Sequence, residues 1–191
     1  MSPAVKFPIV GKRRYSAAQI GRRVAVLARR IDRAYAGSDL VLVGVLKGSV
    51  FFLADLARAL TVPVAIDFVR VASYGNRTSP GTPVRLTKDV EIDVAGKDVL
   101  VIEEVVDTGR SVRFLRRHFE RMRPRSVAFC ALVDKKGRRE RGVTVEFAGF
   151  RPEGGFLVGY GMDHAESGRE LAEIYEIKPM RPAGRSAGGP G

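Results

Sequence analysis

The chain has 191 residues, of which 45% are hydrophobic and 28% are charged, and its formal net charge at pH 7 is +12. This composition is typical of a globular domain with a sizeable core and excludes an intrinsically disordered chain. The single cysteine, Cys130, excludes an internal disulfide framework and a cysteine-rich metal site. No apolar run has the length of a membrane span and the first residues show no signal-peptide pattern, so we expect a cytoplasmic protein.

The positive charge is compatible with three kinds of partner: nucleic acid, an anionic membrane surface or a strongly anionic small substrate. The basic residues are mostly arginines, and they are spread along the chain without a long run. A solvated basic surface is the simplest interpretation of that spacing. The charge alone therefore identifies no partner.

The first predicted element is a helix over residues 16–35. Ser16 is suited to cap its N-terminus, with Gln19 three residues later completing a capping box. Apolar residues recur at helical spacing on one face of this segment: Ile20, Val24, Leu27 and Ile31.

Apolar runs of strand length then alternate with helical patterns. In chain order, the predicted elements are a strand over Leu40–Leu46, a helix over Val50–Leu60, strands over Val62–Val71 and Val99–Ile102, a helix from about Ser111, a strand over Ser126–Val133, and shorter strand candidates at Val143–Phe147 and Phe156–Val158. Strands that are apolar on both faces and alternate with helices indicate an α/β fold with a mainly parallel sheet covered on both sides.

Two stretches lack such periodicity. Residues 73–89 are polar and contain glycine and proline, which predicts a long loop of the kind that is functional or mobile. Residues 181–191 are rich in glycine and proline, which predicts a disordered tail. Because no linker or repeat interrupts the rest, residues 1–180 are expected to form a single domain.

The most informative segment runs from Val99 to Ser111, where a buried-type strand leads through an acidic turn into a helix. In an open parallel sheet, ligands bind beyond the carboxyl ends of the strands. Free N–H groups at a helix N-terminus suit a phosphate, and the hydroxyls of Thr108 and Ser111 add donors. Gly109 allows the backbone to approach closely. The segment therefore predicts a phosphate cradle.

Three acids precede or enter this cradle: Glu103, Glu104 and Asp107. They would repel a phosphate unless they faced something else, and ribose hydroxyls and a divalent cation are their natural partners. A solvated acidic loop is the alternative, and it is the commoner case for an acidic loop alone. The apolar strand, the short loop and the helix together favour the binding site. The fingerprints of P-loop and dinucleotide-binding proteins are absent.

This segment resembles the phosphoribosyl-pyrophosphate signature of type I phosphoribosyltransferases. Three further matches narrow the resemblance to the hypoxanthine-guanine branch, and all occur in that branch's order across roughly residues 40 to 178. They are Leu46-Lys47-Gly48-Ser49, Ser73-Tyr74-Gly75, and Leu132-Val133-Asp134-Lys135 together with the segment from Phe156 to Asp163. Each short motif is weak alone, and the set of four is specific.

The resemblance implies a type I phosphoribosyltransferase-like fold. This is a parallel sheet flanked by helices, with a mobile lid loop at residues 73–89 and a small hood built from the N-terminal segment and about residues 150–180. It also implies purine salvage, in which phosphoribosyl pyrophosphate and a 6-oxopurine give IMP or GMP and pyrophosphate with Mg²⁺ as cofactor. A homodimer or homotetramer is implied, with no membrane and no specific nucleic acid as partner.

The resemblance also assigns roles to individual residues. At the sugar donor, Thr108, Gly109, Arg110 and Ser111 would hold the 5′-phosphate, Glu103 and Glu104 the ribose hydroxyls, Lys47, Gly48 and Arg169 the pyrophosphate, and Ser73 and Tyr74 would begin the lid. At the base, Asp107 would be the catalytic base facing the imidazole ring, Lys135 would donate to the 6-oxo group, Phe156 would stack, and the Leu157 backbone would meet the purine edge. Asp163 would bind magnesium, with Glu103 and Glu104 as further candidate metal ligands.

Two of these roles have a clear physical basis beside a simpler alternative. Lys135 can only donate, so it suits a 6-oxo acceptor and mismatches the amino group of adenine. A planar Phe156 ring offers stacking worth about 1–3 kcal/mol per base. Without the resemblance, however, a lysine in a basic run is usually solvated and a phenylalanine at a strand start usually belongs to the core.

The sequence departs from the branch's pattern at two places. Glu103-Glu104 stands where the branch usually has Glu-Asp, so the second carboxylate reaches one methylene further, which puts the affinity for ribose in question. Residues 164–173 keep Arg169 but lack the aromatic residues common there.

Two other functions compete with this interpretation. One is a regulator with the same fold that binds RNA or DNA and uses the sugar site as a sensor, which the charge of +12 would suit. The other is an enzyme of the same fold that acts on xanthine or a pyrimidine, since Lys135 separates oxo bases poorly.

Overall fold

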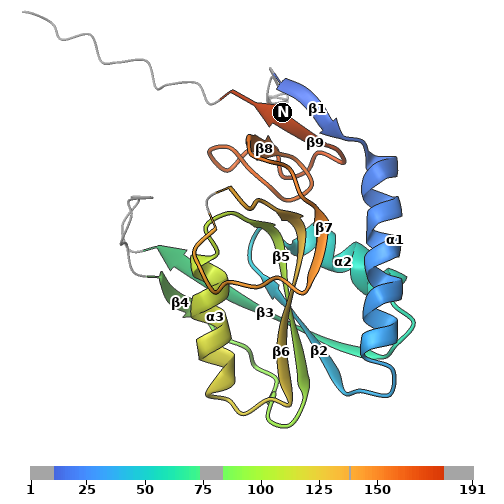
Figure 1. Cartoon of the computed structure of the whole chain (residues 1–191), viewed down its shortest axis with the longest axis vertical. Coiled ribbons are helices and arrows are strands. Elements are labelled where there is room, and N and C mark those ends of the chain that lie inside the picture. The colour runs from blue at the N-terminus through green and yellow to red at the C-terminus, as the bar shows by residue number, and fades with distance from the viewer. Residues whose placement is uncertain (1–10, 74–83, 138, 179–191) are drawn as a thin grey trace, which may run out of the picture.

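The structure is a computed structural model that describes residues 11–73, 84–137 and 139–178. A six-stranded sheet with order β4-β3-β2-β5-β6-β7 forms its centre, and a three-stranded sheet with order β1-β9-β8 lies beyond one edge of it (Figure 1). The elements are β1 Gly11–Tyr15, α1 Ala17–Ala34, β2 Leu40–Val45, α2 Val50–Ala59, β3 Val64–Ser73, β4 Val84–Lys88, β5 Asp98–Val106, α3 Arg110–Glu120, β6 Ser126–Asp134, β7 Phe147–Phe150, β8 Phe156–Val158 and β9 Ile174–Ile177.

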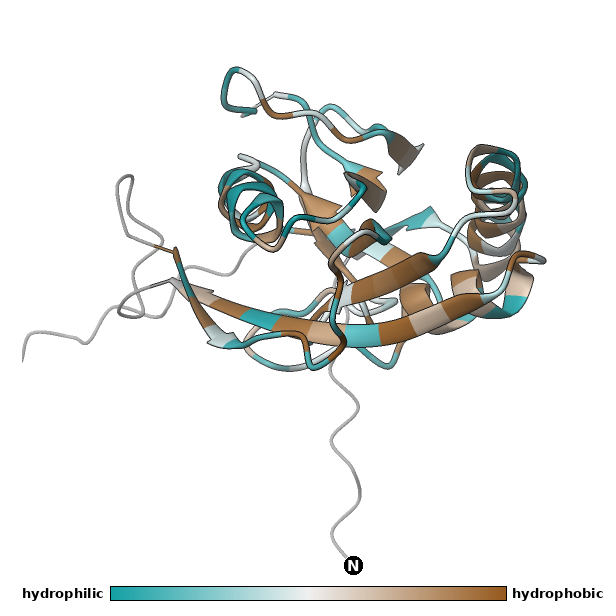
Figure 2. Ribbon diagram, turned by 90° about the horizontal axis from the view of Figure 1, so that it is seen from below, coloured by the Kyte–Doolittle hydropathy of each residue, from teal (hydrophilic) through white to brown (hydrophobic). Residues whose placement is uncertain are grey.

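Five strands of the central sheet, from β3 to β7 in spatial order, run parallel. All six residues of β2 are buried, as a strand covered on both faces requires. The apolar side chains of α1 and α2 join one buried cluster and those of α3 join the other, so the helices cover opposite faces. Figure 2 shows the largely hydrophobic colouring of these central strands. The predicted α/β class with a covered, mainly parallel sheet is confirmed.

Helix α1 begins as its sequence predicts. The Ser16 hydroxyl accepts the Gln19 N–H at 3.3 Å, and the Gln19 side chain accepts the Ser16 N–H at 2.8 Å. This reciprocal pair satisfies two N–H groups that the first turn leaves without a helical partner. The predicted apolar face is buried, from Ile20 to Ile31.

The predicted loop over residues 73–89 is wrong in its second half. Residues 84–88 form the edge strand β4, which pairs antiparallel with β3 through Ser73↔Val84 and Arg70↔Lys88. Its burial alternates along the strand and three of its five side chains are polar, which is typical of an edge strand. In the sequence, such a polar segment looks like a loop. Tyr74 and the rest of residues 74–83, including most of the predicted lid, lie outside the described residues.

The strand predicted at Val143–Phe147 is also wrong, because β7 begins at Phe147 and pairs with β6 through Cys130↔Phe147. The Glu146 carboxylate explains the later start. It accepts the N–H of Phe129 at 2.7 Å, so a side chain satisfies the β6 group that a longer β7 would have paired. The segment before Phe147 therefore has no strand partner at that position.

The small sheet joins distant parts of the sequence. Strand β1 pairs with β9 through Gly11↔Ile177, and β9 pairs with β8 through Ile177↔Phe156. This sheet corresponds to the predicted hood, although β1 and β9 were not predicted as strands. A hydrogen bond of 2.5 Å from the Tyr160 hydroxyl to the Asp55 carboxylate ties the hood region to α2. Within the described part of the chain, no helix combines the length and apolar character needed to cross a membrane.

Candidate active site

The predicted site residues follow neighbouring parallel strands at the same edge of the sheet. Lys47 and Gly48 follow β2, Glu103 and Glu104 are among the last residues of β5, and Lys135 follows β6. The prediction that both glutamates lie in a loop is wrong, because β5 continues to Val106. The hood lies over this edge (Figure 1). The arrangement is the one in which α/β proteins bind ligands.

Two glycines let three segments pack against one another. A side chain at Gly48 would overlap the Glu104 carboxylate, and a side chain at Gly161 would overlap the Gly48 carbonyl oxygen. Gly161 also has a φ of +97°, which favours glycine. The peptide bond between Leu46 and Lys47 is cis. The loop after β2, the acidic end of β5 and the hood therefore meet in direct contact.

The two neighbouring glutamates are poorly solvated. Glu103 is 5% exposed, and its Oε1 atom has no hydrogen-bond partner among the described residues. Burial raises its pKa well above the ordinary value, and the charge of Glu104 raises the pKa further, against a hydrogen bond with Ser111. Burial likewise raises the pKa of Glu104 to about 7. Because Glu103 Oε1 has no donor among the described residues and both carboxyls are poorly solvated, hydroxyls or a cation would bind here favourably.

The acids of this site fit a magnesium ion that arrives with a substrate. Carboxylate oxygens are suitable ligands, and magnesium is usually bound through one or two carboxylates with substrate phosphates and water. Among the described residues, no group of three Asp, Glu, His or Cys side chains lies close enough to share an ion. Glu103, Glu104 and Asp163 therefore form no cage of their own, whereas Glu103 Oε1 has no hydrogen-bond partner among the described residues and still offers an acceptor.

The phosphate cradle is built at the N-terminus of α3. Gly109 is its N-cap with a φ of +81°, and a side chain there would overlap Val143. The N-cap residue supplies no side-chain hydrogen bond, and the N-terminus of a helix is where backbone N–H groups bind an anion. The Thr108 carbonyl accepts the N–H of Glu140 at 2.9 Å, and this hydrogen bond fixes the turn that precedes α3. The structure thus brings the predicted phosphate-binding residues 108–111 together.

The predicted base-binding residues surround the next strand end. The backbone N–H of Lys135 donates to the Val106 carbonyl at 2.9 Å, and its Nζ donates to the Gly155 carbonyl at 2.8 Å. Phe156 is 38% exposed, so its ring is available for stacking, and it meets the His164 ring edge-on at 5.4 Å. Leu157 is buried beside it. Lys135 and Phe156 are thus on facing segments, as a base site requires.

Lys47, in the loop after β2, and Arg169, in the hood, both pair with acids of the hood. Arg169 donates to the Gly161 carbonyl at 2.8 Å and pairs with Asp163 at 2.8 Å. Lys47 pairs with Glu166 at 2.9 Å, and that contact is the main reason why the pKa of Glu166 is lowered. Sequence reasoning missed Glu166. The only signal in the sequence is the position of Glu166 three residues before Arg169.

Sequence reasoning also missed Arg139, which stands in a basic run. Its Nε donates to the Asp107 carbonyl at 3.2 Å, and its second nitrogen donates to the Val106 and Lys135 carbonyls, each at 3.3 Å. The same guanidinium pairs with Asp134, which is 2% exposed. One side chain therefore joins the ends of β5 and β6. A pattern search could not separate it from its basic neighbours.

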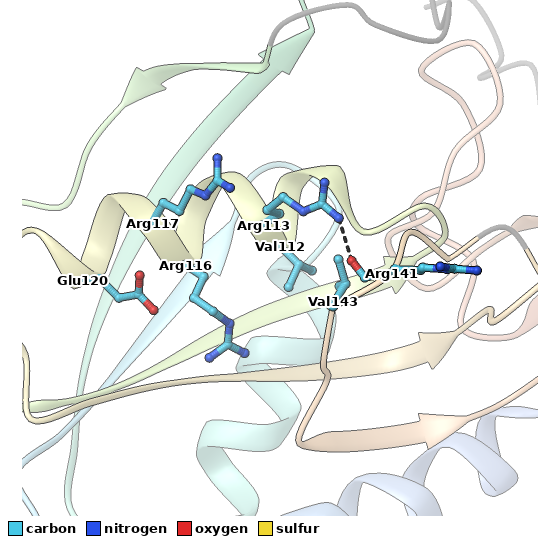
Figure 3. A pocket seen from close by; sticks show the side chains of 8 residues that line it. Val112, Arg113, Arg116, Arg117, Glu120, Arg141 and Val143 are labelled. Carbon is cyan, nitrogen blue, oxygen red and sulfur yellow. Dashed lines mark hydrogen bonds between the residues drawn. The ribbon is translucent and has the colours of Figure 1, made fainter.

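A cavity of about 400 Å³ lies between α3 and residues 141–143 (Figure 3). Arg113 there donates to the Arg141 carbonyl and pairs with Glu140, both at 2.8 Å. Arg116 pairs with Glu146 at 2.8 Å. Two of the four arginines that line the cavity are thus paired with carboxylates. This pairing favours an ordinary basic surface over a second site for an anion.

Comparison with known proteins adds an independent line of evidence. A model of the phosphoribosyl transferase domain matches residues 14–165. The chain is 43% identical over 162 residues to a hypoxanthine phosphoribosyltransferase of Escherichia coli K12, which covers 84% of this chain and 91% of that protein. It is 40% identical over 170 residues to a hypoxanthine-guanine phosphoribosyltransferase of Mycobacterium tuberculosis H37Rv, with 86% and 84% covered.

Solved structures agree with these sequence matches. A crystal structure of a hypoxanthine-guanine phosphoribosyltransferase from Bacillus anthracis, with HEPES in its active site, has a TM-score of 0.84 at 40% identity. The match covers 87% of this chain and 98% of that one. A hypoxanthine phosphoribosyltransferase from Trypanosoma cruzi has a TM-score of 0.85 at 32% identity, with 91% and 94% covered.

Proposed function

The chain belongs to the phosphoribosyl transferase family, and we propose that it acts in purine salvage as a hypoxanthine (guanine) phosphoribosyltransferase. It would transfer the 5-phosphoribosyl group of phosphoribosyl pyrophosphate to the 6-oxopurine, giving IMP or GMP and pyrophosphate. Curated relatives with this activity in their names support the proposal, because the alignments span most of both chains.

One observation carries the proposal: Asp107 and Lys135 lie at adjoining strand ends that are fixed to each other. The Lys135 N–H donates to the Val106 carbonyl at 2.9 Å, and Arg139 donates to the carbonyls of Asp107 and Lys135. A base placed between these segments would meet a carboxylate on its imidazole side and a donor on its 6-oxo side. Neither residue alone would select a 6-oxopurine.

The mechanism follows from what each segment offers. A nitrogen of the base displaces pyrophosphate at the anomeric carbon through an oxocarbenium-like state, while the Asp107 carboxylate accepts the proton that the imidazole ring loses, so that no positive charge builds up on the base. Residues 108–111 hold the 5′-phosphate, and the carboxyls of Glu103 and Glu104 hold the ribose hydroxyls. Lys47 and Arg169 neutralise the departing pyrophosphate, which fixes the leaving group in position. When bound, magnesium supplies further stabilisation of the pyrophosphate charge.

The nucleic-acid regulator is the second candidate, and the charge of +12 favours it. The ion pairs that hold Arg113 and Arg116 weaken this case. A membrane partner is not proposed. The homodimer or homotetramer and the cytoplasmic location stay predictions.

A steady-state assay tests the proposal. Purified protein, phosphoribosyl pyrophosphate and magnesium are combined with hypoxanthine, guanine, xanthine, adenine or uracil, and nucleotide formation is measured. Turnover of hypoxanthine or guanine is expected. If only xanthine or only uracil reacts, the protein is instead an enzyme of the same fold that acts on xanthine or on a pyrimidine. No turnover, together with a tight complex with RNA or duplex DNA at physiological salt, would favour the regulator.

A further inference from the structure

Glu166 stands at the tip of a two-residue turn in the hood. His164 and Ser167 exchange both of their backbone hydrogen bonds, at 3.0 and 3.1 Å, and close this turn. The two residues between them have positive φ angles, +51° at Ala165 and +66° at Glu166. Positive φ at both central positions is the pattern of a type I′ turn, which asparagine and glycine usually fill. Alanine and glutamate are unfavourable there, so the turn conformation is held by its surroundings.

The turn presents the Glu166 carboxylate to two cations. Its Oε2 atom lies 2.9 Å from Lys47 Nζ and 3.6 Å from an Arg169 nitrogen. The Glu166 N–H donates to Asp163 Oδ2 at 2.8 Å, and Asp163 also pairs with Arg169. Lys47 belongs to the loop after β2, far away in the sequence. One carboxylate of the hood therefore bridges the two residues that are expected to bind pyrophosphate.

This contact is suited to being broken. The side chains of Lys47 and Glu166 are 53% and 68% exposed, and exposed ion pairs contribute little to stability. A pyrophosphate carries more negative charge and more acceptor oxygens than a carboxylate, so it forms more charge-assisted hydrogen bonds with the same two cations. Arg169 would keep its place during the exchange, because it also donates to the Gly161 carbonyl at 2.8 Å.

We propose that Glu166 is an internal competitor of pyrophosphate, whose carboxylate pairs with Lys47 and Arg169 in the free protein and leaves when the pyrophosphate group binds. Glu166 thereby weakens the binding of pyrophosphate and speeds its release after transfer. This inference rests on the proposed function, since it takes the same two cations as the pyrophosphate site. Beyond that function, it assigns to Glu166 a role in setting the affinity for pyrophosphate, because Glu166 competes with pyrophosphate for Lys47 and Arg169.

The test is calorimetric titration of inorganic pyrophosphate into the wild-type protein and Glu166→Gln at fixed magnesium. The amide keeps the size of the side chain and loses its charge, so pyrophosphate should bind about 3–10-fold more tightly. Its release, followed by stopped flow, should slow by a similar factor. The matched control is Glu170→Gln, which removes the same charge from an exposed residue that makes no ion pair within the described part of the chain. It should change the affinity less than about 2-fold.

A second variant, Glu166→Gly, guards against a folding defect. Glycine favours the positive φ at this position, so the turn should persist while the carboxylate is lost. Tighter binding in both variants supports the inference. Equal pyrophosphate affinities of Glu166→Gln and Glu170→Gln, or weaker binding in Glu166→Gln, would overturn the inference. Turnover by the wild-type protein would then still support the proposed function. A wild-type protein that neither binds pyrophosphate nor transfers phosphoribosyl would overturn both.

Discussion

The guanidinium of Arg139 pairs with the buried carboxylate of Asp134 and donates to the Asp107 carbonyl at 3.2 Å. Through this contact, the last residue of β6 fixes the loop that carries the proposed catalytic base. Arg151 approaches the other oxygen of Asp134 at 3.5 Å, so two arginines compensate one buried charge. Because a guanidinium is a planar fork of five donors, Arg139 can serve a carboxylate and several carbonyls at once.

The first prediction concerns the guanidinium group of Arg139. Arg139→Lys keeps the charge but offers no planar set of donors, so at least one carbonyl loses its partner. We expect the free energy of unfolding to fall by about 1–3 kcal/mol, and the turnover number to fall more than the KM for the base changes. Urea unfolding and steady-state kinetics measure both. Arg141→Lys, an exposed neighbour, is the control, and equal stability of the two variants would contradict the bracing role.

The second prediction concerns base selection by Lys135. Its ammonium group can only donate, so hypoxanthine or guanine should react and adenine should be nearly inert. A donor that faces the amino group of adenine goes unpaired, at about 1–3 kcal/mol. The measurement is kcat/KM for the three bases at one phosphoribosyl pyrophosphate concentration. Adenine turnover as fast as that of hypoxanthine would show that Lys135 is placed wrongly.

The third prediction concerns the half-buried Glu104. Burial raises the pKa of Glu104 from its ordinary 4.5 to about 7 in the folded protein. Between these two values the folded state holds a proton that the unfolded state has lost, so this group's contribution to stability falls as the pH rises from about 4.5 to 7. Glu104→Gln removes that loss, so it should unfold at a higher temperature than the wild type at pH 8.

The stability gain should be about 3 kcal/mol at pH 8 and should vanish near pH 4, where the carboxyl is protonated in both the folded and the unfolded state. Affinity for phosphoribosyl pyrophosphate should fall at the same time, because the ribose loses a charged acceptor. Thermal melts at the two pH values measure the first effect, and titration of the sugar donor measures the second. Glu170→Gln should show neither effect, and a gain of the same size at both pH values would contradict the assignment to Glu104.

The sequence was sufficient for elements whose side chains carry a strong period or a cap. Helix α1 formed with the predicted Ser16 cap, and the apolar run at β2 became a central strand. It was insufficient where tertiary contacts override the local pattern. Glu146 satisfies the Phe129 N–H and delays β7, and β4 exists because β3 provides an edge for it.

The same division holds for the site. Short motifs predicted the segments that meet at the sheet edge, because those motifs occupy strand ends that any parallel sheet brings together. Arg139 and Glu166 act through contacts with residues far along the chain or across a turn, and neither belongs to a periodic pattern. Their identification needed the folded structure.

The fourth prediction concerns the metal. Activity should require magnesium or manganese, and Asp163→Asn should raise the magnesium concentration for half-maximal rate several-fold, because an amide is a weaker ligand than a carboxylate. Asparagine can still accept the Glu166 N–H that Asp163 accepts at 2.8 Å, so the turn should persist. A circular dichroism melt checks that the fold is intact. Full activity in excess chelator would contradict the metal requirement.

The last prediction tests the catalytic base. Asp107→Asn keeps the size of the side chain and leaves intact the backbone carbonyl that Arg139 contacts at 3.2 Å, but it removes the proton acceptor. General-base assistance contributes about 10²–10⁴-fold, so turnover should fall within that range. Binding of phosphoribosyl pyrophosphate should change far less, because the N-terminus of α3 is untouched. Turnover and sugar affinity are measured for both proteins under the same conditions. Unchanged turnover with weaker sugar binding would make Asp107 a binding residue and place the base elsewhere.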